Sequence, residues 1–286
     1  EDGTPRVHML FDVLVGLGRV LVKKNELIYR PEWGDTIGFQ LAAVVNKLRL
    51  NLINSIEDEF PIAEDGISLD VDGFVKAAID ASAQVSESLV PFLGLKLTAR
   101  TVKSQFQDHT TFHICSFVAS ILLESRDDEG SWSRAIPPRT DSQKKAIANW
   151  YLYDRLRGEW GNAGDSLFFN RVWTNTTPED RTPKYERNSI YAASPSREAF
   201  KHTLDNWFVN EFSKQHKERE IISSETKLVL RYFYAPRVPF WDNHAATFHI
   251  DHLLPIHFWK RFFDSSNEPG LPINGVGNLC LMNTAD

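Results

Sequence analysis

The sequence is poor in cysteine, and this limits the kinds of site that it can build. Only Cys115 and Cys280 occur in 286 residues, and no Cys-x-x-Cys pair is present. A disulfide framework and a zinc knuckle built on thiolates are therefore excluded. Such cysteine usage is typical of a reducing compartment, so we expect a cytoplasmic protein.

Long apolar runs are also missing. No run approaches the roughly 18 residues that a membrane-spanning helix needs, so we expect no membrane partner. Residues 1–6 contain neither an initiator methionine nor a basic stretch, and we expect a piece of a longer protein that is not secreted. The chain lacks a Gly-x-x-x-x-Gly-Lys loop, and from this we predict that it has no nucleotide site and no nucleotide cofactor.

Positive charge is in slight deficit. There are 32 Lys and Arg against 38 Asp and Glu, a net charge of −6. This argues against a protein that coats nucleic acid through bulk charge. It leaves room for a DNA enzyme, because binding depends on where the basic residues lie and a catalytic metal needs acidic ligands. Basic groups occur at 134–145, 181–187 and 214–219, although solvated helix ends and loops would also explain them.

Apolar residues at three- and four-residue spacing dominate the first 240 residues and predict a mainly α-helical protein. Asp72, Thr140 or Asp141, and Ser223 or Ser224 are suitable N-caps, and Pro195 suits a first helical position. These signals predict helices over about 10–21, 41–56, 72–92, 103–124, 141–156, 195–212 and 224–235.

Two of these helices have predicted inward faces that the structure can test. In the helix over 141–156, we expect the inward face to consist of Ala146, Trp150, Tyr153 and Leu156. In the helix over 195–212, we expect it to consist of Phe200, Leu204, Trp207, Phe208 and Phe212.

The pattern changes near the C-terminus. Residues 246–258 are aromatic and β-branched, and residues 273–282 alternate loosely between apolar and small, which predicts two strands of a hairpin joined by a long loop. No other clear strand signal occurs. We expect a helical domain over 1–128, a second helical region over 129–240 and a C-terminal motif over 241–286.

That motif contains four of the nine histidines: His244, His249, His252 and His257. A structural zinc site would need more closing ligands than this stretch offers. Ordinary surface or core histidines are the simplest explanation for any one of them. A third explanation is hydrolysis of a phosphodiester, favoured by the adjacent pair Asp251-His252 with Asn278 in the second apolar run.

Each residue type suits a task in that reaction. Neutral imidazole can deprotonate water near neutral pH, and a carboxylate suits a hard divalent cation that neutralises charge on the phosphoryl oxygens. Adjacent strand residues point to opposite faces, so Asp251 and His252 can act together only if the strand ends or bends there. Pro255 makes such an end expected.

The stretch His249-Ile-Asp-His-Leu-Leu-Pro255 followed by Ile273-Asn-Gly-Val-Gly-Asn-Leu-Cys-Leu281 resembles the HNH, or ββα-metal, endonucleases. It is most similar to the C-terminal region of modification-dependent restriction proteins of the GmrSD-like and phosphorothioate-sensing kinds. The resemblance implies a helical scaffold followed by a ββα-metal hairpin, and a DNA-nicking enzyme of prokaryotic anti-phage defence. It also implies Mg²⁺ or Mn²⁺ as cofactor, modified or phage DNA as partner, and an N-terminal ParB-like regulatory domain in the full-length protein.

Carried over residue by residue, the resemblance makes His252 the general base and Asp251 a metal ligand. Asn278 would hold the loop or orient the base. His249 and His257 are candidates for phosphate contact, and Lys260 and Arg261 for holding the DNA backbone. The family's final helix would begin at about Asn283, so the last metal ligand is not in view. The alternative function is a helical DNA-binding or regulatory module whose hairpin no longer cuts.

Overall fold

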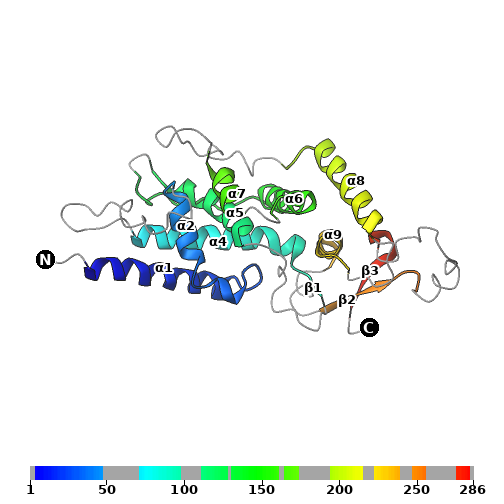
Figure 1. Ribbon diagram of the computed structural model, residues 1–286, viewed down its shortest axis with the longest axis horizontal. Coiled ribbons are helices and arrows are strands. Elements are labelled where there is room, and N and C mark those ends of the chain that lie inside the picture. The colour runs from blue at the N-terminus through cyan, green and yellow to red at the C-terminus, as the bar shows by residue number, and fades with distance from the viewer. Residues whose placement is uncertain are drawn as a thin grey trace.

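The computed structural model describes residues 4–47, 71–97, 111–127, 130–160, 164–173, 194–214, 222–238, 247–255 and 275–283. The chain is mainly helical, as predicted, and ends in a small antiparallel hairpin (Figure 1). The α-helices are α1 (Thr4–Lys24), α2 (Ile37–Val45), α4 (Val71–Leu93), α5 (Thr111–Leu122), α6 (Asp141–Arg157), α7 (Gly164–Val172), α8 (Arg197–Lys214) and α9 (Ser224–Tyr234). The strands are β1 (Lys96–Leu97), β2 (Thr247–His252) and β3 (Leu279–Asn283).

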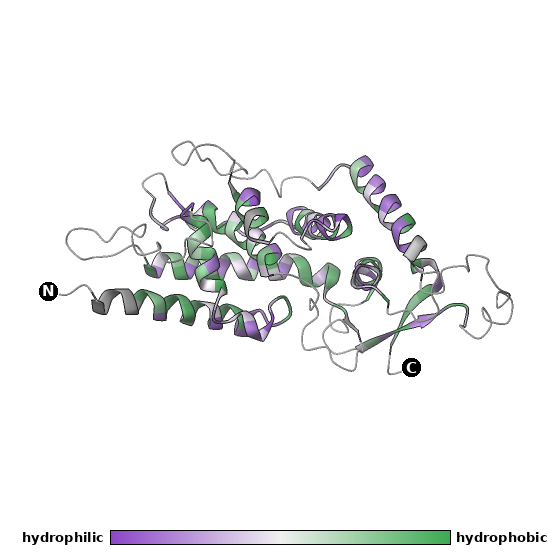
Figure 2. Ribbon diagram, in the orientation of Figure 1, coloured by the Kyte–Doolittle hydropathy of each residue, from purple (hydrophilic) through white to green (hydrophobic). Residues whose placement is uncertain are grey.

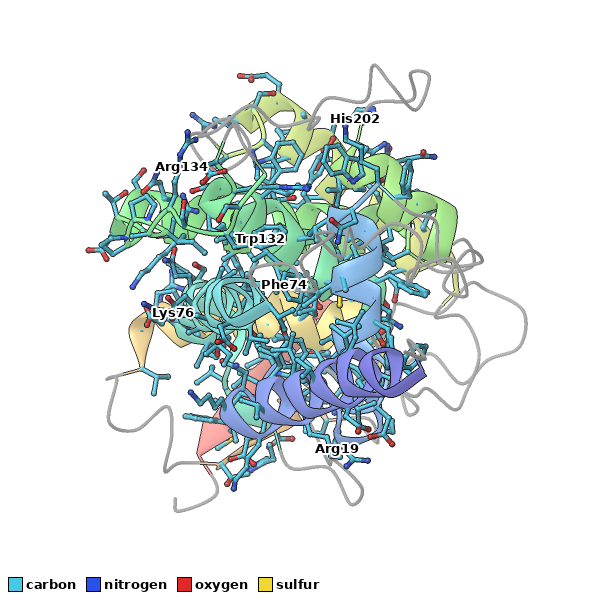
Figure 3. The ribbon with its side chains drawn as sticks, turned by 90° about the vertical axis from the view of Figure 1, so that its left-hand side faces the viewer. Arg19, Phe74, Lys76, Trp132, Arg134 and His202 are labelled. Carbon is cyan, nitrogen blue, oxygen red and sulfur yellow. The ribbon has the colours of Figure 1, made fainter. Side chains whose placement is uncertain are left out.

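The helices bury one large hydrophobic core. Helices α4 and α5 lie at its centre, and their inward faces are almost wholly apolar (Figure 2). Phe74 of α4 meets Trp132 edge to face with ring centroids 5.4 Å apart, a geometry that aromatic pairs favour. Figure 3 shows both rings inside, while Arg19 and His202 lie toward the outside. Among the described residues, no helix has the length and apolar character needed to cross a bilayer.

Local capping explains several helix boundaries. Thr140 caps α6 as predicted, and it forms a capping box with Gln143. Ser223 caps α9, with its hydroxyl accepting from the Thr226 amide at 3.1 Å. Two predicted starts are wrong by a residue or two. Asp72 lies within the first turn of α4 and not before it. Helix α8 begins at Arg197, two residues after Pro195, because the Ser196 hydroxyl accepts a hydrogen bond from the Ala199 amide and caps the helix.

Helix α2 ends earlier than the periodicity predicts. Its last residue is Val45, and Lys47 adopts a left-handed conformation with φ of 64°. Asn46 turns its side-chain amide back to the Ala42 carbonyl at 2.8 Å, which satisfies an acceptor at the helix end. The predicted continuation over 48–56 lies outside the described residues.

Two predicted inward faces are right only in part: Ala146, Leu156 and Trp207 are buried as predicted, and Phe200 and Leu204 pack against the core. In α6, Trp150 and Tyr153 are only half-buried, whereas Ile147, Tyr151 and Asp154 are buried. In α8, Phe208 is 44% exposed and Thr203 is buried instead, while the side chain of Phe212 lies outside the described residues. Both errors arise because aromatic residues were assigned inward, although a large ring is stable half-exposed at a helix edge.

The predicted hairpin is present, and it belongs to a sheet of order β1-β2-β3. Strands β2 and β3 are antiparallel, while β1 pairs with β2 in parallel through Lys96 opposite Thr247. Strand β1 was not predicted, because two residues are too few for strand periodicity to show. The hairpin is therefore joined to the helical part through the segment that leaves α4.

A second, smaller hydrophobic core fixes the hairpin to the helices. It combines Leu95, Leu230 of α9, Phe248 of β2 and Leu281 of β3. Buried Arg231 adds a hydrogen bond from its Nε to the Leu95 carbonyl at 3.1 Å. Residues about 150 positions apart in sequence thus meet at one junction, and α9 holds the strand that carries Asp251 and His252.

Candidate active site

Strand β2 carries the candidate pair at its end. Asp251 lies opposite Cys280 of β3, and His252 lies opposite Leu279. Because directly opposed residues share a face of the sheet, Asp251 and Cys280 lie on one face, and His252 lies on the face of buried Phe248. Asp251 is exposed and His252 is half-buried. Solvent therefore reaches the carboxylate, and the imidazole lies at the rim of the small core.

The strand ends directly after the candidate pair, so Asp251 and His252 keep strand geometry and lie on opposite faces of the sheet. His252 is the last residue of β2, and the chain bends at Leu253 and Leu254. The Asp251 carboxylate accepts a hydrogen bond from the His252 backbone amide at 2.8 Å. This contact fixes the carboxylate close to the backbone of the neighbouring residue.

Asn278 holds the bend after His252 in place. Its Oδ1 accepts from the Leu254 amide at 2.9 Å, and its Nδ2 donates to the Leu254 carbonyl at 3.4 Å. Its own backbone carbonyl accepts from the Leu253 amide at 2.8 Å. A side-chain amide carries a donor and an acceptor side by side, which matches both polar groups of one peptide residue. This is the loop-holding geometry considered for Asn278 in the sequence analysis.

We expect Asn278→Asp to destabilise this bend, although the substitution only exchanges an amide group for a carboxylate. The aspartate would place a second acceptor against the Leu254 carbonyl, where an N–H now donates. The expected loss of unfolding free energy is about 0.5 to 1.5 kcal/mol, the usual net contribution of a hydrogen bond, because both contacts of the Asn278 side chain are open to solvent. Chemical denaturation measures it, with Met282→Ala on the exposed face of β3 as control. A stability equal to that of the control would contradict the clamp.

The remaining predicted residues divide into two groups. His249 lies on the same face of β2 as Asp251, opposite Met282, and is half-buried. His257, Lys260 and Arg261 lie outside the described residues, so their predicted contacts with phosphate or the DNA backbone stay predictions.

The residues present can be compared with the needs of a divalent metal. Within the described ranges, no group of three or more His, Cys, Asp or Glu side chains comes together. The pKa of Cys280 is raised by burial and by the Asp251 carboxylate, which disfavours a thiolate ligand. An exposed carboxylate alone still fits Mg²⁺, which commonly binds through one or two carboxylates and completes its shell with water and substrate phosphate. Asp251 is the described residue that would hold it.

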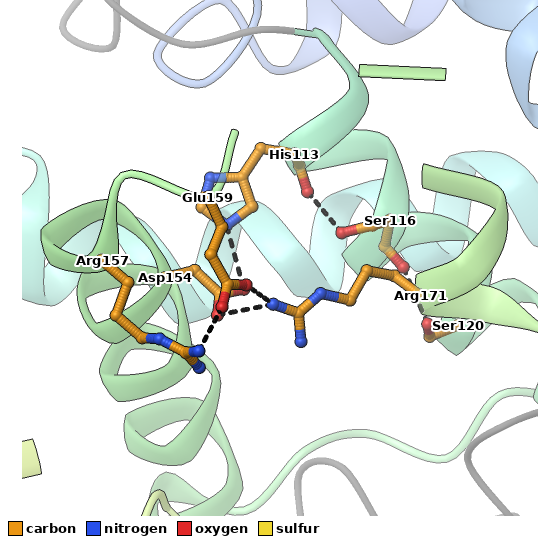
Figure 4. A network of polar contacts seen from close by, with 7 residues as sticks. All are labelled: His113, Ser116, Ser120, Asp154, Arg157, Glu159 and Arg171. Atoms are coloured by element: carbon orange, nitrogen blue, oxygen red, sulfur yellow. Dashed lines mark hydrogen bonds and ion pairs between the residues drawn. The ribbon is translucent and has the colours of Figure 1, made fainter. Parts of the chain in front are cut away.

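A second polar cluster, which the sequence analysis missed, lies inside the helical part (Figure 4). The His113 ring is fully buried and stacks between Tyr151 and Trp160, with centroids 4.5 Å and 4.7 Å away. Its Nε2 lies 3.5 Å from the Asp154 carboxylate, close but without the alignment of a hydrogen bond. The sequence pattern does not indicate this cluster, because Asp154 lies on the same inward face of α6 as its buried apolar neighbours.

Charged residues extend this cluster to the surface. Arg171 of α7 reaches Asp154 at 3.3 Å and also pairs with Glu159, which Arg157 contacts at 2.6 Å. Burial raises the pKa of Asp154, but His113 and Arg171 more than offset this, so the pKa lies below its usual value. Because His113 and Asp154 are both buried, we interpret the cluster as scaffold and not as a substrate site.

This scaffold cluster predicts a loss of stability in mild acid. Burial lowers the pKa of His113 below about 6.5, the value in an unfolded chain, even though Asp154 opposes the shift. The unfolded state therefore binds more protons as pH falls below about 6.5, and the free energy of unfolding decreases by up to about 1.4 kcal/mol per pH unit. Denaturation curves between about pH 7 and pH 5 should be flatter for His113→Gln than for the wild type. Equal slopes would show that His113 is not the source.

Comparison with known proteins gives no relative from which a role could be transferred: no protein-family model, no curated protein and no solved structure matches this chain.

Proposed function

We propose that this chain carries a metal-dependent endonuclease site that nicks DNA. The observation that supports the proposal is the end of β2, where Asp251 and His252 are consecutive residues on opposite faces of the strand and Asn278 clamps the bend that follows. A carboxylate, an imidazole and a rigid turn are the parts that hydrolysis of a phosphodiester requires. The small core beneath them ties this turn to α9 and Leu95.

In the proposed reaction His252 takes a proton from the attacking water. A histidine suits this role because its ordinary pKa of about 6.5 lies near operating pH. Asp251 binds Mg²⁺ or Mn²⁺, and the bound ion would supply charge neutralisation at the phosphate and leaving oxygen. Asn278 acts on the backbone of Leu254 and so keeps His252 in position. One such site cuts one strand, so a double-strand break would require two copies.

The wider context of the proposal rests on the resemblance of the motif alone. It favours modified or phage DNA as the target, a place in a prokaryotic defence protein, and a ParB-like regulatory domain elsewhere in the full-length protein. Positive charge from Lys260 and Arg261, which lie outside the described residues, would hold the DNA backbone.

Supercoiled plasmid provides the test. We expect the full-length protein to convert it to open circles with Mg²⁺ or Mn²⁺ and to stop when the metal is chelated. Binding of the plasmid in a gel without nicking in either metal, with and without added nucleotide, would overturn the proposal. That outcome would favour a DNA-binding or regulatory module whose hairpin does not cut.

A further inference from the structure

The outer face of α1 carries a stripe of small and apolar residues that stays open to solvent in the described part of the chain. Helix α1 packs on α2 and α4 through buried residues such as Leu14 and Leu17. On its opposite side, Val13, Gly16 and Val20 are exposed. Their spacing of three and four residues places them on one stripe, and this is the spacing of the seam between two paired helices. Figure 1 shows α1 along the lower edge of the helical part.

Gly16 lies at the centre of this stripe, and packing within one chain does not explain it. Gly18, two residues further on, is explained, because a Cβ there would lie 2.2 Å from the Gly34 carbonyl oxygen. A Cβ at Gly16 would meet no other part of the described chain within 4 Å. A glycine inside a helix is destabilising relative to alanine, so Gly16 brings no benefit to a single copy. Its missing side chain would instead let the backbone of another helix approach closely.

Charged residues beside the stripe indicate the orientation of that second helix. Asp12 and Arg19 lie on one flank, and Lys23 continues the stripe toward the end of α1; all three are exposed. If two copies of α1 crossed antiparallel at Gly16, Asp12 of one would lie within about one residue of Arg19 of the other along the axis. A parallel pair would set Lys23 against Lys23, whereas the antiparallel pair separates these ammonium groups by about 21 Å. Arg19 already contacts Asp35 at 2.8 Å, but its five N–H donors leave capacity for a second carboxylate.

We propose that α1 pairs with α1 of a second copy of this chain, antiparallel and crossing at Gly16. A two-fold axis through the crossing point makes the interface isologous, so both copies use the same surface. The flanks then form two equal ion pairs, each between Asp12 of one copy and Arg19 of the other. This charge complementarity of the face with itself favours a second copy over an unrelated protein. The pairing does not rest on the proposed function, but if both hold, the dimer carries two nicking sites.

Sedimentation equilibrium of the full-length protein without DNA tests the pairing. A contact made by one helix is small for a protein interface, so we expect a dimer with a dissociation constant of about 1 to 100 µM. Gly16→Leu should raise this constant at least about tenfold by overfilling the crossing point, while the open space around Gly16 preserves the fold. Lys145→Leu, an exposed change on α6, should leave the constant unchanged. Wild-type protein that sediments as a monomer at the upper end of this range, or equal constants for the two variants, would overturn the pairing.

An exchange of charges tests the antiparallel orientation. Asp12→Arg sets two arginines against each other on each flank and should raise the dissociation constant by about tenfold. Adding Arg19→Glu should restore most of the affinity, because each ion pair is rebuilt with opposite polarity. Circular dichroism verifies that both variants keep their helices, since Arg19→Glu also gives up the exposed contact with Asp35. A double variant that associates no better than Asp12→Arg alone would overturn the antiparallel crossing, and neither result bears on plasmid nicking.

Discussion

Replacing Asp154 with Ala should lower the free energy of unfolding by about 1 to 3 kcal/mol, the usual cost of leaving buried polar groups without their partner. Asp154 is 5% exposed and lies beside His113 and Arg171. Without the carboxylate, Arg171 keeps Glu159 but loses its inner partner, and His113 loses its only close anion in the described residues. The small alanine side chain would also leave a void beside His113, which adds to the loss.

Asp205→Ala is the matched control for this change. Asp205 also lies on a helix with a cationic partner, Lys201 at 2.7 Å, but both side chains are more than half exposed. Exposed pairs of this kind contribute less than about 1 kcal/mol. Thermal and chemical unfolding of the two variants should therefore differ clearly. Similar losses in both would contradict the view that the buried cluster holds α5, α6 and α7 together.

Helices were predictable where local chemistry decides them. Thr140 and Gln143 form the capping box that marks the start of α6, and Ser223 marks the start of α9. The helix faces were harder, because the same stretch of α6 offers both Tyr151 and Tyr153 to the core. Only the position of His113, which stacks with Tyr151 on one side and with Trp160 on the other, decides between them. Burial of Asp154 likewise depends on Arg171 of another helix.

In the candidate site, too, local features were predictable and long-range contacts were not. Residues close together in sequence, such as Asp251, His252 and the hairpin that carries them, were predictable from a short pattern. Strand β1 and the bond from Arg231 to Leu95 were not, because each joins residues that are far apart in the chain and leaves no local signal.

His252→Ala should reduce DNA nicking by about 10² to 10⁴-fold, the usual contribution of a positioned general base. The imidazole is half-buried at the end of β2, and the described backbone contacts around it, from the Leu253 and Leu254 amides to Asn278, do not involve its ring. The variant should therefore keep its fold, which unfolding curves can verify. Leu253→Ala is the control, because this side chain is 61% exposed and lies next to His252.

The most direct test of the account is the rate at which supercoiled plasmid is nicked by the wild type, His252→Ala and Leu253→Ala in the same Mg²⁺ or Mn²⁺ buffer. We predict rapid nicking by the wild type and the Leu253 variant, and almost none by His252→Ala. Equal nicking by all three proteins would contradict the role proposed for His252 and with it the proposed active site.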